Sequence, residues 1–510
     1  MKCFKMIRNV IKKIRRNPRN IKMKLVVAIT FVGLFLYAYS SQKEDQTITW
    51  KVKLDNVVVH IDLKNTPLKL SYLTKLLPIL KKLGVTGLLI EYEDMFPYIG
   101  ELAQIKNQDS YRRSELKNFL SVCKNTNIEV IPLVQTFGHM EYVLQFQQFR
   151  ELREVDDHMD SICPSKLKSL DLIRNMLSQV MLFHKSVAPL KHIHIGCDEV
   201  FNINLKVCNE CTKRRQSKER IFMEHIRTVT EIVKNISAET TVLIWDDMIR
   251  SIYVKHPVHQ TAEPVVWNYK KKVMLYHKTL SQYHKIFPNI WIASAFKGAD
   301  GDESILPNIK YRFLNHYSWL QGIRNYKFGG ESNIFNFKGI ILTGWSRYAF
   351  GRKPVDLLPC SIPSLMLNLI LIAKFQTGVC SPKPQYTKDL TVFYSIYLND
   401  SFSKMLDCDM MDIDVNNNYF HFIFDYDNLS LDNCNFTEWK LYKSVKEYIK
   451  FYYTVNGTEI NSKLRDQYLE KMYELNFTLF HIMNEYYAPN FVNEYVNNLI
   501  LKIKDLLIKS

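Results

Sequence analysis

The sequence lacks the compositional extremes that would exclude a large folded core. Only 16 of its 510 residues are glycine and 17 are proline, whereas 47% are hydrophobic and 13% are aromatic. Collagen-like, low-complexity and wholly disordered chains have different compositions, so these classes are excluded for most of the chain. The length indicates two or three domains, or one large barrel with an appendage.

Beyond residue 24 the sequence also lacks a strong charge of either sign. The formal charge of +17 arises largely from residues 1–24, which hold ten Lys and Arg and no acidic residue. The remainder has 58 basic against 51 acidic residues. Because a nucleic-acid groove requires a basic surface on the folded domain, this distribution predicts no nucleic-acid partner.

An uncharged run of eighteen residues, 25–42, follows the basic residues. That length is about the minimum for a helix that crosses a bilayer. We expect 1–24 to be a basic cytosolic tail, 25–42 a signal-anchor transmembrane helix and 43–54 a stem. The prediction is a single-pass type II membrane protein of the Golgi or secretory pathway, with residues 43–510 in the lumen or outside the cell. Cleavage near Ala38 and Ser40, which would release a secreted protein, is the alternative.

Motifs for N-glycosylation agree with a lumenal location. Such a motif, N-x-S/T, marks an acceptor only where the chain passes through the secretory pathway. Five of the six motifs come after residue 398, which indicates an accessible surface in the C-terminal part. The six acceptors are Asn235, Asn399, Asn428, Asn435, Asn456 and Asn476.

The ten cysteines give no complete metal-binding pattern. Cys208 and Cys211 lie in a Cys-Asn-Glu-Cys sequence that could be half a zinc site, but no second pair follows at zinc-finger spacing. In an oxidising compartment the favoured interpretation is a disulfide that involves these two residues, with Cys197 as a further candidate partner and the connectivity open. We therefore expect neither a metal nor another cofactor.

Short β-branched runs alternate with amphipathic stretches beyond the stem, which is typical of repeated βα units around a parallel sheet. An open doubly wound sheet normally has fewer than eight strands. The pattern therefore predicts an α/β fold, a (β/α)8 TIM barrel over about residues 55–370. The expected strands cover residues 57–63, 86–93, 128–134, 192–196, 241–247, 264–269, 289–295 and 339–345.

Helices are expected between these strands and after the barrel. One begins with Thr66 as the N-cap and Pro67 at the first helical position. Residues 371–510 are expected to be a mainly helical region in which tyrosines pack rather than bind a ligand. A further helix is indicated by apolar residues at steps of three and four, namely Leu167, Leu170, Ile173, Leu177, Val180 and Met181.

The fourth expected strand ends in a string of chemically active residues. In a barrel of this type the C-terminal ends of the strands form the active face. The strand runs into His194-Ile-Gly-Cys-Asp198-Glu199, and adjacent acids after an apolar strand are unusual because a buried carboxylate needs partners or takes up a proton. A helix-capping loop would account for a bare Asp-Glu pair, but it does not account for the whole H-x-G-x-D-E string.

The segment HIHIGCDEV resembles the signature of family-20 glycoside hydrolases, the β-N-acetylhexosaminidases. Five further segments resemble the hexosaminidase D branch of that family: IEYEDMFPY (90–98), TFGHMEYVL (136–144), ICPS (162–165), IWDDM (244–248) and ASAFKGA (293–299). The resemblance covers about residues 55–350. It does not include the C-terminal region or the basic anchor.

The resemblance implies an exo-acting hydrolase that removes terminal GlcNAc or GalNAc from glycans by substrate-assisted, retaining catalysis. The 2-acetamido oxygen of the sugar attacks its own anomeric carbon, so no protein nucleophile is needed. Glu199 would be the general acid and base. Asp198 would hold the acetamido N–H and stabilise the positive charge of the intermediate. Neighbouring residues on a strand point to opposite faces, which disfavours an ordinary two-carboxylate mechanism for this pair.

Other strand ends supply groups for sugar binding. Trp245, Trp267 and Trp345 close three of the expected strands, and aromatic faces stack on the C–H surfaces of sugars. The resemblance implies a sugar contact or an orienting role for His139, and a structural histidine with satisfied hydrogen bonds is the alternative. Acidic residues at strand ends that could bind hydroxyl groups or orient the acid are Glu93, Asp94, Asp246 and Asp247.

Two features of the family have no clear counterpart in this sequence. The arginine that the family carries on its first strand is absent, and this chain offers His60, Asp62 and Lys64 there instead. The family also has a tyrosine that donates to the acetamido carbonyl, for which Tyr269 and Tyr317 are the available residues. The identity of the accepted sugar therefore stays open.

Two other functions remain as alternatives. His192 and His194 place two imidazoles on one strand face, as in metal-dependent barrel hydrolases. No further histidine or acidic residue lies at a spacing typical of a metal site. The other is a catalytically inactive lumenal barrel that binds glycans. A homodimer is compatible with the sequence, which does not determine the oligomeric state.

Overall fold

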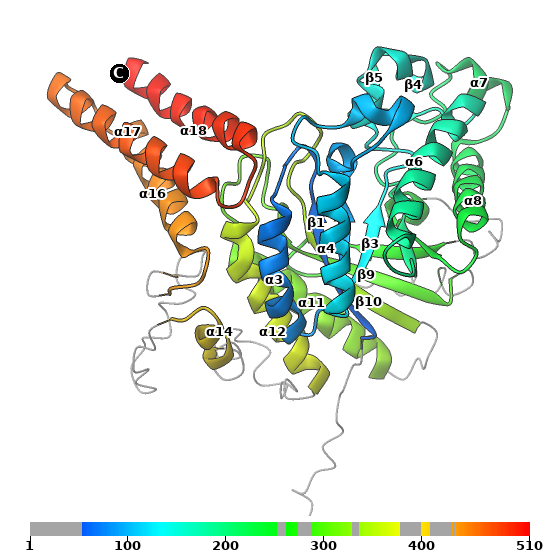
Figure 1. Ribbon diagram of the computed structural model, residues 1–510, viewed down its shortest axis with the longest axis horizontal. Coiled ribbons are helices and arrows are strands. Elements are labelled where there is room, and N and C mark those ends of the chain that lie inside the picture. The colour runs from blue at the N-terminus through cyan, green and yellow to red at the C-terminus, as the bar shows by residue number, and fades with distance from the viewer. Residues whose placement is uncertain are drawn as a thin grey trace, which may run out of the picture. The chain divides into compact units, whose positions relative to one another are not determined.

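The computed structural model describes residues 54–251, 262–273, 283, 287–328, 336–377, 399–408, 431 and 434–509 (Figure 1). The predicted cytosolic tail, the predicted transmembrane helix and almost all of the predicted stem lie outside these residues. The chain divides into one unit over Met1–Lys51 and a second over Val52–Ser510, and all described residues belong to the second.

Eight parallel strands of the described residues form a closed barrel, which confirms the predicted fold (Figure 1). Their order around the barrel is β1-β10-β9-β8-β7-β6-β3-β2, so β1 pairs with both β2 and β10 and closes the sheet. Each expected strand overlaps one of the eight. The strands are β1 (Asn56–Asp62), β2 (Gly87–Glu91), β3 (Glu129–Leu133), β6 (His192–His194), β7 (Thr241–Trp245), β8 (Glu263–Trp267), β9 (Asn289–Lys297) and β10 (Asn336–Gly344).

Strand alternation separates two hydrophobic cores. Val58 of β1 points into the barrel, whereas its neighbours Val57 and Val59 point outward and pack in the layer between strands and helices. The inner core is filled by side chains from seven strands and is not a pore. It contains Val58, Leu89, Ile131, Leu133, Leu243, Trp245, Val265, Trp291, Ala293 and Ile341.

Amphipathic helices surround the barrel because their apolar faces cover the outward side chains of the strands. The predicted helix at Leu167 is α6, and most of its predicted apolar residues are buried. The helices of the barrel include α3 (Leu70–Lys82), α4 (Arg113–Asn125), α6 (Leu167–Lys185), α8 (Lys218–Ile236), α11 (Ile309–Phe328) and α12 (Ile362–Thr377).

The predicted start of the first barrel helix is wrong. Helix α3 begins at Leu70 with Lys69 as its N-cap, and not at Thr66. The hydroxyl of Thr66 instead donates to the carbonyl of Lys64 and accepts from the guanidinium of Arg347. A short-range sequence pattern could not reveal that partner, which lies 281 residues away.

A two-stranded hairpin, β4 (Arg153–Val155) and β5 (His158–Ile162), was not predicted. It is not part of the barrel sheet, and in the chain it lies between β3 and α6. The hairpin is bonded to the loop that follows β3, because Met140 N–H donates to Asp160 O at 2.9 Å and Ile162 N–H donates to Phe137 O at 3.1 Å. It thereby holds the backbone on both sides of His139.

The last barrel helix is strongly apolar. Among the described residues, the stretch Pro359–Thr377 is the one helix with the length and composition to cross a membrane, and 78% of its apolar window is buried within the protein. Its side chains pack against β9 and α11, so burial in the barrel accounts for its composition. This helix also passes the predicted barrel boundary at residue 370.

Three longer helices follow in the C-terminal region: α16 (Trp439–Asn456), α17 (Ser462–Met483) and α18 (Pro489–Lys509). Buried hydrogen bonds join them to the barrel. Tyr72 of α3 donates to the carboxylate of Glu438 at 2.9 Å, and Leu358 N–H donates to the hydroxyl of Tyr487 at 3.2 Å. Many tyrosines here are buried, in agreement with a packing role.

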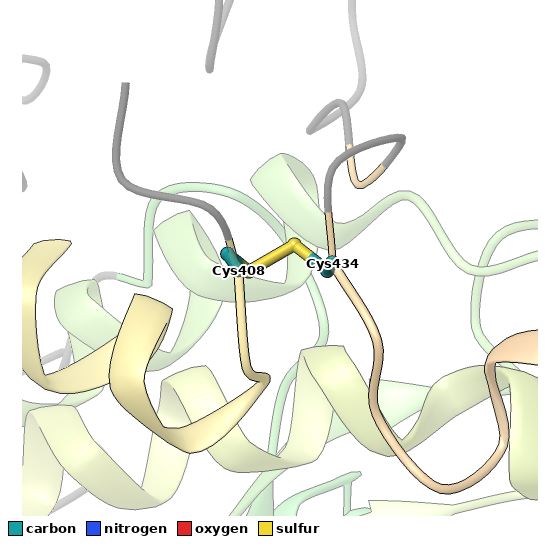
Figure 2. The surroundings of a disulfide bond; sticks show 2 residues. All are labelled: Cys408 and Cys434. Atoms are coloured by element: carbon teal, nitrogen blue, oxygen red, sulfur yellow. A yellow bond between two sulfur atoms is a disulfide. The ribbon is translucent and has the colours of Figure 1, made fainter. Parts of the chain in front are cut away.

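A disulfide links Cys408 and Cys434 (Figure 2). Cys408 follows the short helix α14 (Asn399–Met405), and Cys434 precedes α16. No local sequence pattern distinguishes this pair from the other cysteines. By contrast, Cys197, Cys208 and Cys211 are free and buried, so the predicted disulfide among them is wrong.

Candidate active site

A cavity of about 220 Å³ opens at the C-terminal ends of the barrel strands. Its walls come from the segments after β1, β3, β6, β8, β9 and β10 and from the end of β7. The lining residues are Lys64, His139, Asp198, Glu199, Trp245, Trp267, Tyr269, Gly298, Ala299, Trp345, Arg347 and Tyr348. The cavity therefore brings together the two predicted catalytic acids, Asp198 and Glu199, with His139 and the three predicted tryptophans.

Asp198 and Glu199 both face this cavity, although they are neighbours in the chain. Nε2 of His139 lies 3.4 Å from Oδ2 of Asp198 and 3.5 Å from Oε2 of Glu199. The carboxylate of Asp198 is largely buried, whereas the side chain of Glu199 is 45% exposed. One acid is thus enclosed beside an imidazole, and the other can be reached from solvent.

An unusual backbone conformation allows this arrangement. Cys197, Glu199 and His139 have φ angles of 70°, 48° and 53°, in the left-handed region that side chains rarely adopt. Consecutive strand residues would point to opposite faces, and the left-handed turn after β6 removes that alternation. Gly138 permits the close approach of the two loops, because a Cβ there would lie 2.4 Å from the carbonyl oxygen of Asp198.

The charges of Asp198 and His139 stabilise each other. Burial alone would raise the pKa of Asp198, but the positive charge and hydrogen bond of His139 lower this pKa below its usual value. Burial alone would lower the pKa of His139, but Asp198 and Glu199 raise it well above the usual range for histidine. The geometry therefore favours an ionised Asp198 beside a protonated imidazole.

Asp247 supports the site from the end of β7. Its Oδ2 accepts the backbone N–H of Glu199 at 2.9 Å, and its Oδ1 accepts Nε1 of Trp267 at 3.3 Å. Burial and the nearby charge of Asp198 raise the pKa of Asp247 to about 7. One carboxyl group thus fixes both the backbone of Glu199 and the ring of Trp267.

A buried polar network lies behind Asp198. The amide of Gln135 donates to Asp198 at 3.3 Å and to Glu91 at 3.0 Å. Glu91 also contacts His60 at 3.2 Å and Lys64 at 3.9 Å. Buried polar contacts of this kind hold the Gln135 amide and the two carboxylates in fixed orientations.

Aromatic rings also line the cavity. Trp267 stacks on Tyr269 with ring centroids 5.1 Å apart, and Nε1 of Trp345 donates to the hydroxyl of Tyr269 at 3.0 Å. Trp245 and Trp345 pack with centroids 5.7 Å apart. All three predicted tryptophans and Tyr269 therefore belong to one aromatic wall.

None of the four predicted sugar-binding acids, Glu93, Asp94, Asp246 and Asp247, is among the residues that line the cavity. Asp246 is fully buried, and its carboxylate accepts from Arg250, from the hydroxyl of Tyr283 at 2.9 Å and from Trp267 N–H at 3.2 Å. Glu93 is also buried, 3.3 Å from Nζ of Lys64. Both remain predictions as sugar ligands, but the observed contacts are those of supporting residues.

Several cavity residues were not predicted. Arg347 and Tyr348 follow the end of β10 in a Trp-Ser-Arg-Tyr sequence, of which only Trp345 was a predicted site residue. Gly298 and Ala299 follow β9 in the same way. The signal was their position just beyond a strand, where the active face of a barrel lies.

The two strand histidines have other partners. Nδ1 of His192 lies 2.8 Å from Oε1 of Glu129. Nδ1 of His194 accepts the N–H of Gly196 at 3.0 Å, and its ring packs 4.3 Å from that of Trp245. Burial lowers the pKa of His194 to about 3, so this imidazole is neutral.

Comparison with known proteins identifies the family. The family model described as "Glycosyl hydrolase family 20, catalytic domain" matches residues 73–289. Hexosaminidase D of Bos taurus is 39% identical over 321 residues, which cover 61% of this chain and 90% of the relative. The chain belongs to glycosyl hydrolase family 20. It is therefore a glycoside hydrolase.

Other similar proteins are hexosaminidases by name. Hexosaminidase D of Homo sapiens is 39% identical over 336 residues, which cover 63% of this chain and 67% of the relative. A β-N-acetylhexosaminidase structure from Bacteroides fragilis has a TM-score of 0.48 and 13% identity, covering 68% of this chain and 71% of that one. An N-acetyl-β-hexosaminidase structure from Streptomyces plicatus has a TM-score of 0.45 and 12% identity, covering 68% of this chain and 66% of that one.

Proposed function

We propose that this family-20 enzyme is an exo-acting β-N-acetylhexosaminidase that removes terminal non-reducing GlcNAc or GalNAc by substrate-assisted catalysis. The observation that carries the proposal is the shared position of Asp198 and Glu199 at one cavity, with His139 within 3.5 Å of both. A buried carboxylate and an accessible one suit two different tasks on the same sugar.

In the first step, the acetamido carbonyl oxygen of the sugar forms a bond to C1 while the bond from C1 to the leaving oxygen breaks. Glu199 donates its proton to that oxygen. Asp198 accepts the acetamido N–H and stabilises the positive charge of the oxazolinium-like intermediate. The low pKa of Asp198 supports this role, because only the ionised carboxylate supplies the negative charge.

In the second step, the Glu199 carboxylate takes a proton from water, and the water oxygen bonds to C1 as the oxazolinium ring opens. The acetamido group is restored, and two displacements at C1 leave its configuration unchanged. The partly exposed position of Glu199 gives water access to this carboxylate.

The aromatic wall supports recognition of the sugar. We assign the floor under the ring and its N-acetyl methyl group to Trp245, Trp267 and Trp345, which line the cavity. Tyr269 is assigned as the donor to the acetamido carbonyl, since Trp345 fixes its hydroxyl at 3.0 Å. Lys64 lies at the end of β1 and lines the cavity, so it takes the place of the family's arginine in binding outer hydroxyl groups.

The test compares hydrolysis of 4-nitrophenyl N-acetyl-β-glucosaminide and N-acetyl-β-galactosaminide by the full-length chain. Glu199→Gln should lower kcat by about 10²- to 10⁴-fold, the usual contribution of a general acid and base, without changing the melting temperature. Glu231→Gln, on the exposed face of α8, is the matched control. A near-normal rate in Glu199→Gln would overturn the assignment.

Two further outcomes separate the alternatives. A wild-type chain that binds these glycans and cleaves neither would indicate a non-catalytic barrel. His192→Gln should keep nearly full activity, because His192 contacts Glu129 and does not line the cavity. Its inactivation with the fold intact would instead favour a metal-dependent site on β6.

We propose in addition that the catalytic part lies in the secretory lumen, anchored by residues 25–42. The uncharged run behind a basic head supports a type II orientation, and disulfides such as Cys408–Cys434 persist in oxidising compartments. Among the predicted glycosylation sites, Asn235, Asn435 and Asn456 are exposed. Removal of N-glycans should shift the electrophoretic mobility of the cell-derived chain, and an unshifted chain accessible to cytosolic protease would contradict this topology.

A further inference from the structure

Three cysteines and a glutamate form a buried cluster outside the active-site cavity. Glu154, Cys163, Cys208 and Cys211 each offer one ligand atom, and these atoms all lie within 4.8 Å of one another. All four residues are at most 7% exposed. We call this set the thiolate cluster.

The spacing within the thiolate cluster suits a tetrahedral metal ion. Sγ of Cys163 lies 3.3 Å from Sγ of Cys208 and 3.7 Å from Sγ of Cys211. Oε2 of Glu154 lies 3.1 Å from Sγ of Cys211. A zinc ion with Zn–S bonds of about 2.3 Å holds its sulfur ligands about 3.8 Å apart in a tetrahedron. Small outward shifts of the side chains would therefore complete the coordination.

Neighbouring groups hold the ligands in position. The backbone N–H of Asn204 donates to Oε1 of Glu154 at 2.9 Å, which leaves Oε2 facing the sulfur atoms. Oγ of Ser165 lies 3.1 Å from Sγ of Cys211 and accepts from Arg214 at 3.2 Å. Outer contacts of this kind orient the ligands of metal sites.

We propose that the thiolate cluster binds one Zn²⁺ as a closed structural site. Three thiolates and one carboxylate give four ligands of the types that zinc accepts, and soft sulfur donors select against Mg²⁺ and Ca²⁺. With four protein ligands the ion has no open position, so it does not activate water. A disulfide would use two of the three thiols and would give no role to Glu154 beside them.

The position of the thiolate cluster indicates that it supports segments next to the active site. Glu154 lies in β4, Cys163 directly follows β5, and Cys208 and Cys211 flank the start of α7 (Asn209–Lys213). The metal ion would therefore link the segment that follows Glu199 to the β4–β5 hairpin.

The same hairpin contacts both active-site loops. Asp160 O accepts the N–H of Met140, next to His139, and Oδ1 of Asp160 accepts Nδ2 of Asn202 at 2.9 Å. Since none of the four ligands lines the cavity, they are positioning residues and not catalytic ones.

The first experiment measures metal content by mass spectrometry after purification of the full-length chain without chelator. We expect one zinc per chain in the wild type, and loss of stoichiometric zinc in Cys163→Ser and Cys211→Ser. Cys123→Ser and Cys360→Ser, which alter free buried cysteines elsewhere, are matched controls and should keep the zinc. Absence of zinc from the wild type, or its retention in both ligand variants, would overturn the proposal.

A second experiment stays informative if the serine variants fail to fold. After exchange of the wild-type metal for Co²⁺, thiolate-to-cobalt absorption bands should appear, and Glu154→Gln should release the metal to a chelator at least tenfold faster. Alkylation of the chelated, denatured chain should label all three cluster thiols. A disulfide among them together with no cobalt bands would refute the site, and neither readout depends on hydrolase activity.

Discussion

The carboxyl group of Asp247 accepts the backbone N–H of Glu199 at 2.9 Å, which ties the end of β7 to the loop after β6. Glu199 has a φ angle of 48°, a conformation that costs free energy and persists only where neighbouring contacts maintain it. Asp247 supplies such a contact and also accepts Nε1 of Trp267 at 3.3 Å. The proposed acid and part of the aromatic wall therefore depend on one side chain.

Asp247→Ala should lower kcat/KM by about 10- to 100-fold, since leaving the backbone N–H of Glu199 without its acceptor costs about 1–3 kcal/mol. Asp247→Asn should fall between the wild type and the alanine variant, because an amide keeps one acceptor oxygen. Asp171→Asn, on the exposed face of α6, is the control. Steady-state kinetics on an aryl glycoside give the comparison, and equal rates for Asp247→Ala and the wild type would contradict the positioning role.

The raised pKa of Asp247 predicts a specific pH dependence of stability. Between pH 4 and 7 the unfolded chain loses the Asp247 proton, whereas the folded chain keeps it, because its pKa there is about 7. The folded state thus binds more protons, so the contribution of Asp247 to the free energy of unfolding falls as pH rises through this window. Asp247→Asn should flatten the decline in denaturant titrations, and an unchanged slope would argue against the shift.

His139→Gln tests the electrostatic pairing with Asp198. His139 lowers the pKa of Asp198 against the effect of burial, so its removal should raise that pKa. The acidic limb of the pH profile of kcat/KM should then move towards neutral pH. In the wild type, the stabilising pair forms while His139 is protonated and is lost as pH rises through its raised pKa. A variant with a lower rate but an unmoved acidic limb would assign His139 another role.

The contact between Trp345 and Tyr269 should give non-additive kinetics. Tyr269→Phe removes the hydroxyl assigned to the acetamido carbonyl, and Trp345→Phe removes the N–H that holds this hydroxyl at 3.0 Å. If both act through one hydroxyl, the double variant should lose little more than Tyr269→Phe alone. The hydrolysis rates of the wild type, the two single variants and the double variant are compared on the GlcNAc aryl glycoside. Fully additive losses of activation free energy would show that the two side chains work independently.

The Cys408–Cys434 disulfide should stabilise the C-terminal region. The bond spans 26 residues, and for a loop of that size a disulfide contributes about 3 kcal/mol to the free energy of unfolding. Cys408→Ser with Cys434→Ser should lower the melting temperature, and reductant should then have no further effect. Cys123→Ser serves as the control, because its thiol is free. A wild-type melting temperature in the double variant would exclude a stabilising role.

Local patterns predicted the barrel well because its strands carry their own signal. Each of the eight expected runs overlaps a strand, since buried parallel strands are continuous apolar segments. Predictions failed where the partner was distant in sequence. Thr66 bonds to Arg347, 281 residues away, and Cys208 and Cys211 approach Cys163, which lies 45 and 48 residues upstream of them.

The sequence by itself determined the α/β alternation, the family and the acids Asp198 and Glu199, because strand periodicity and a short motif are local properties. Only the tertiary structure decided that Lys64, Tyr269 and Arg347 border the same cavity while Asp246 lies behind it. The physical reason is barrel closure: pairing β1 with β10 brings together residues almost 300 positions apart, and no local pattern specifies such contacts.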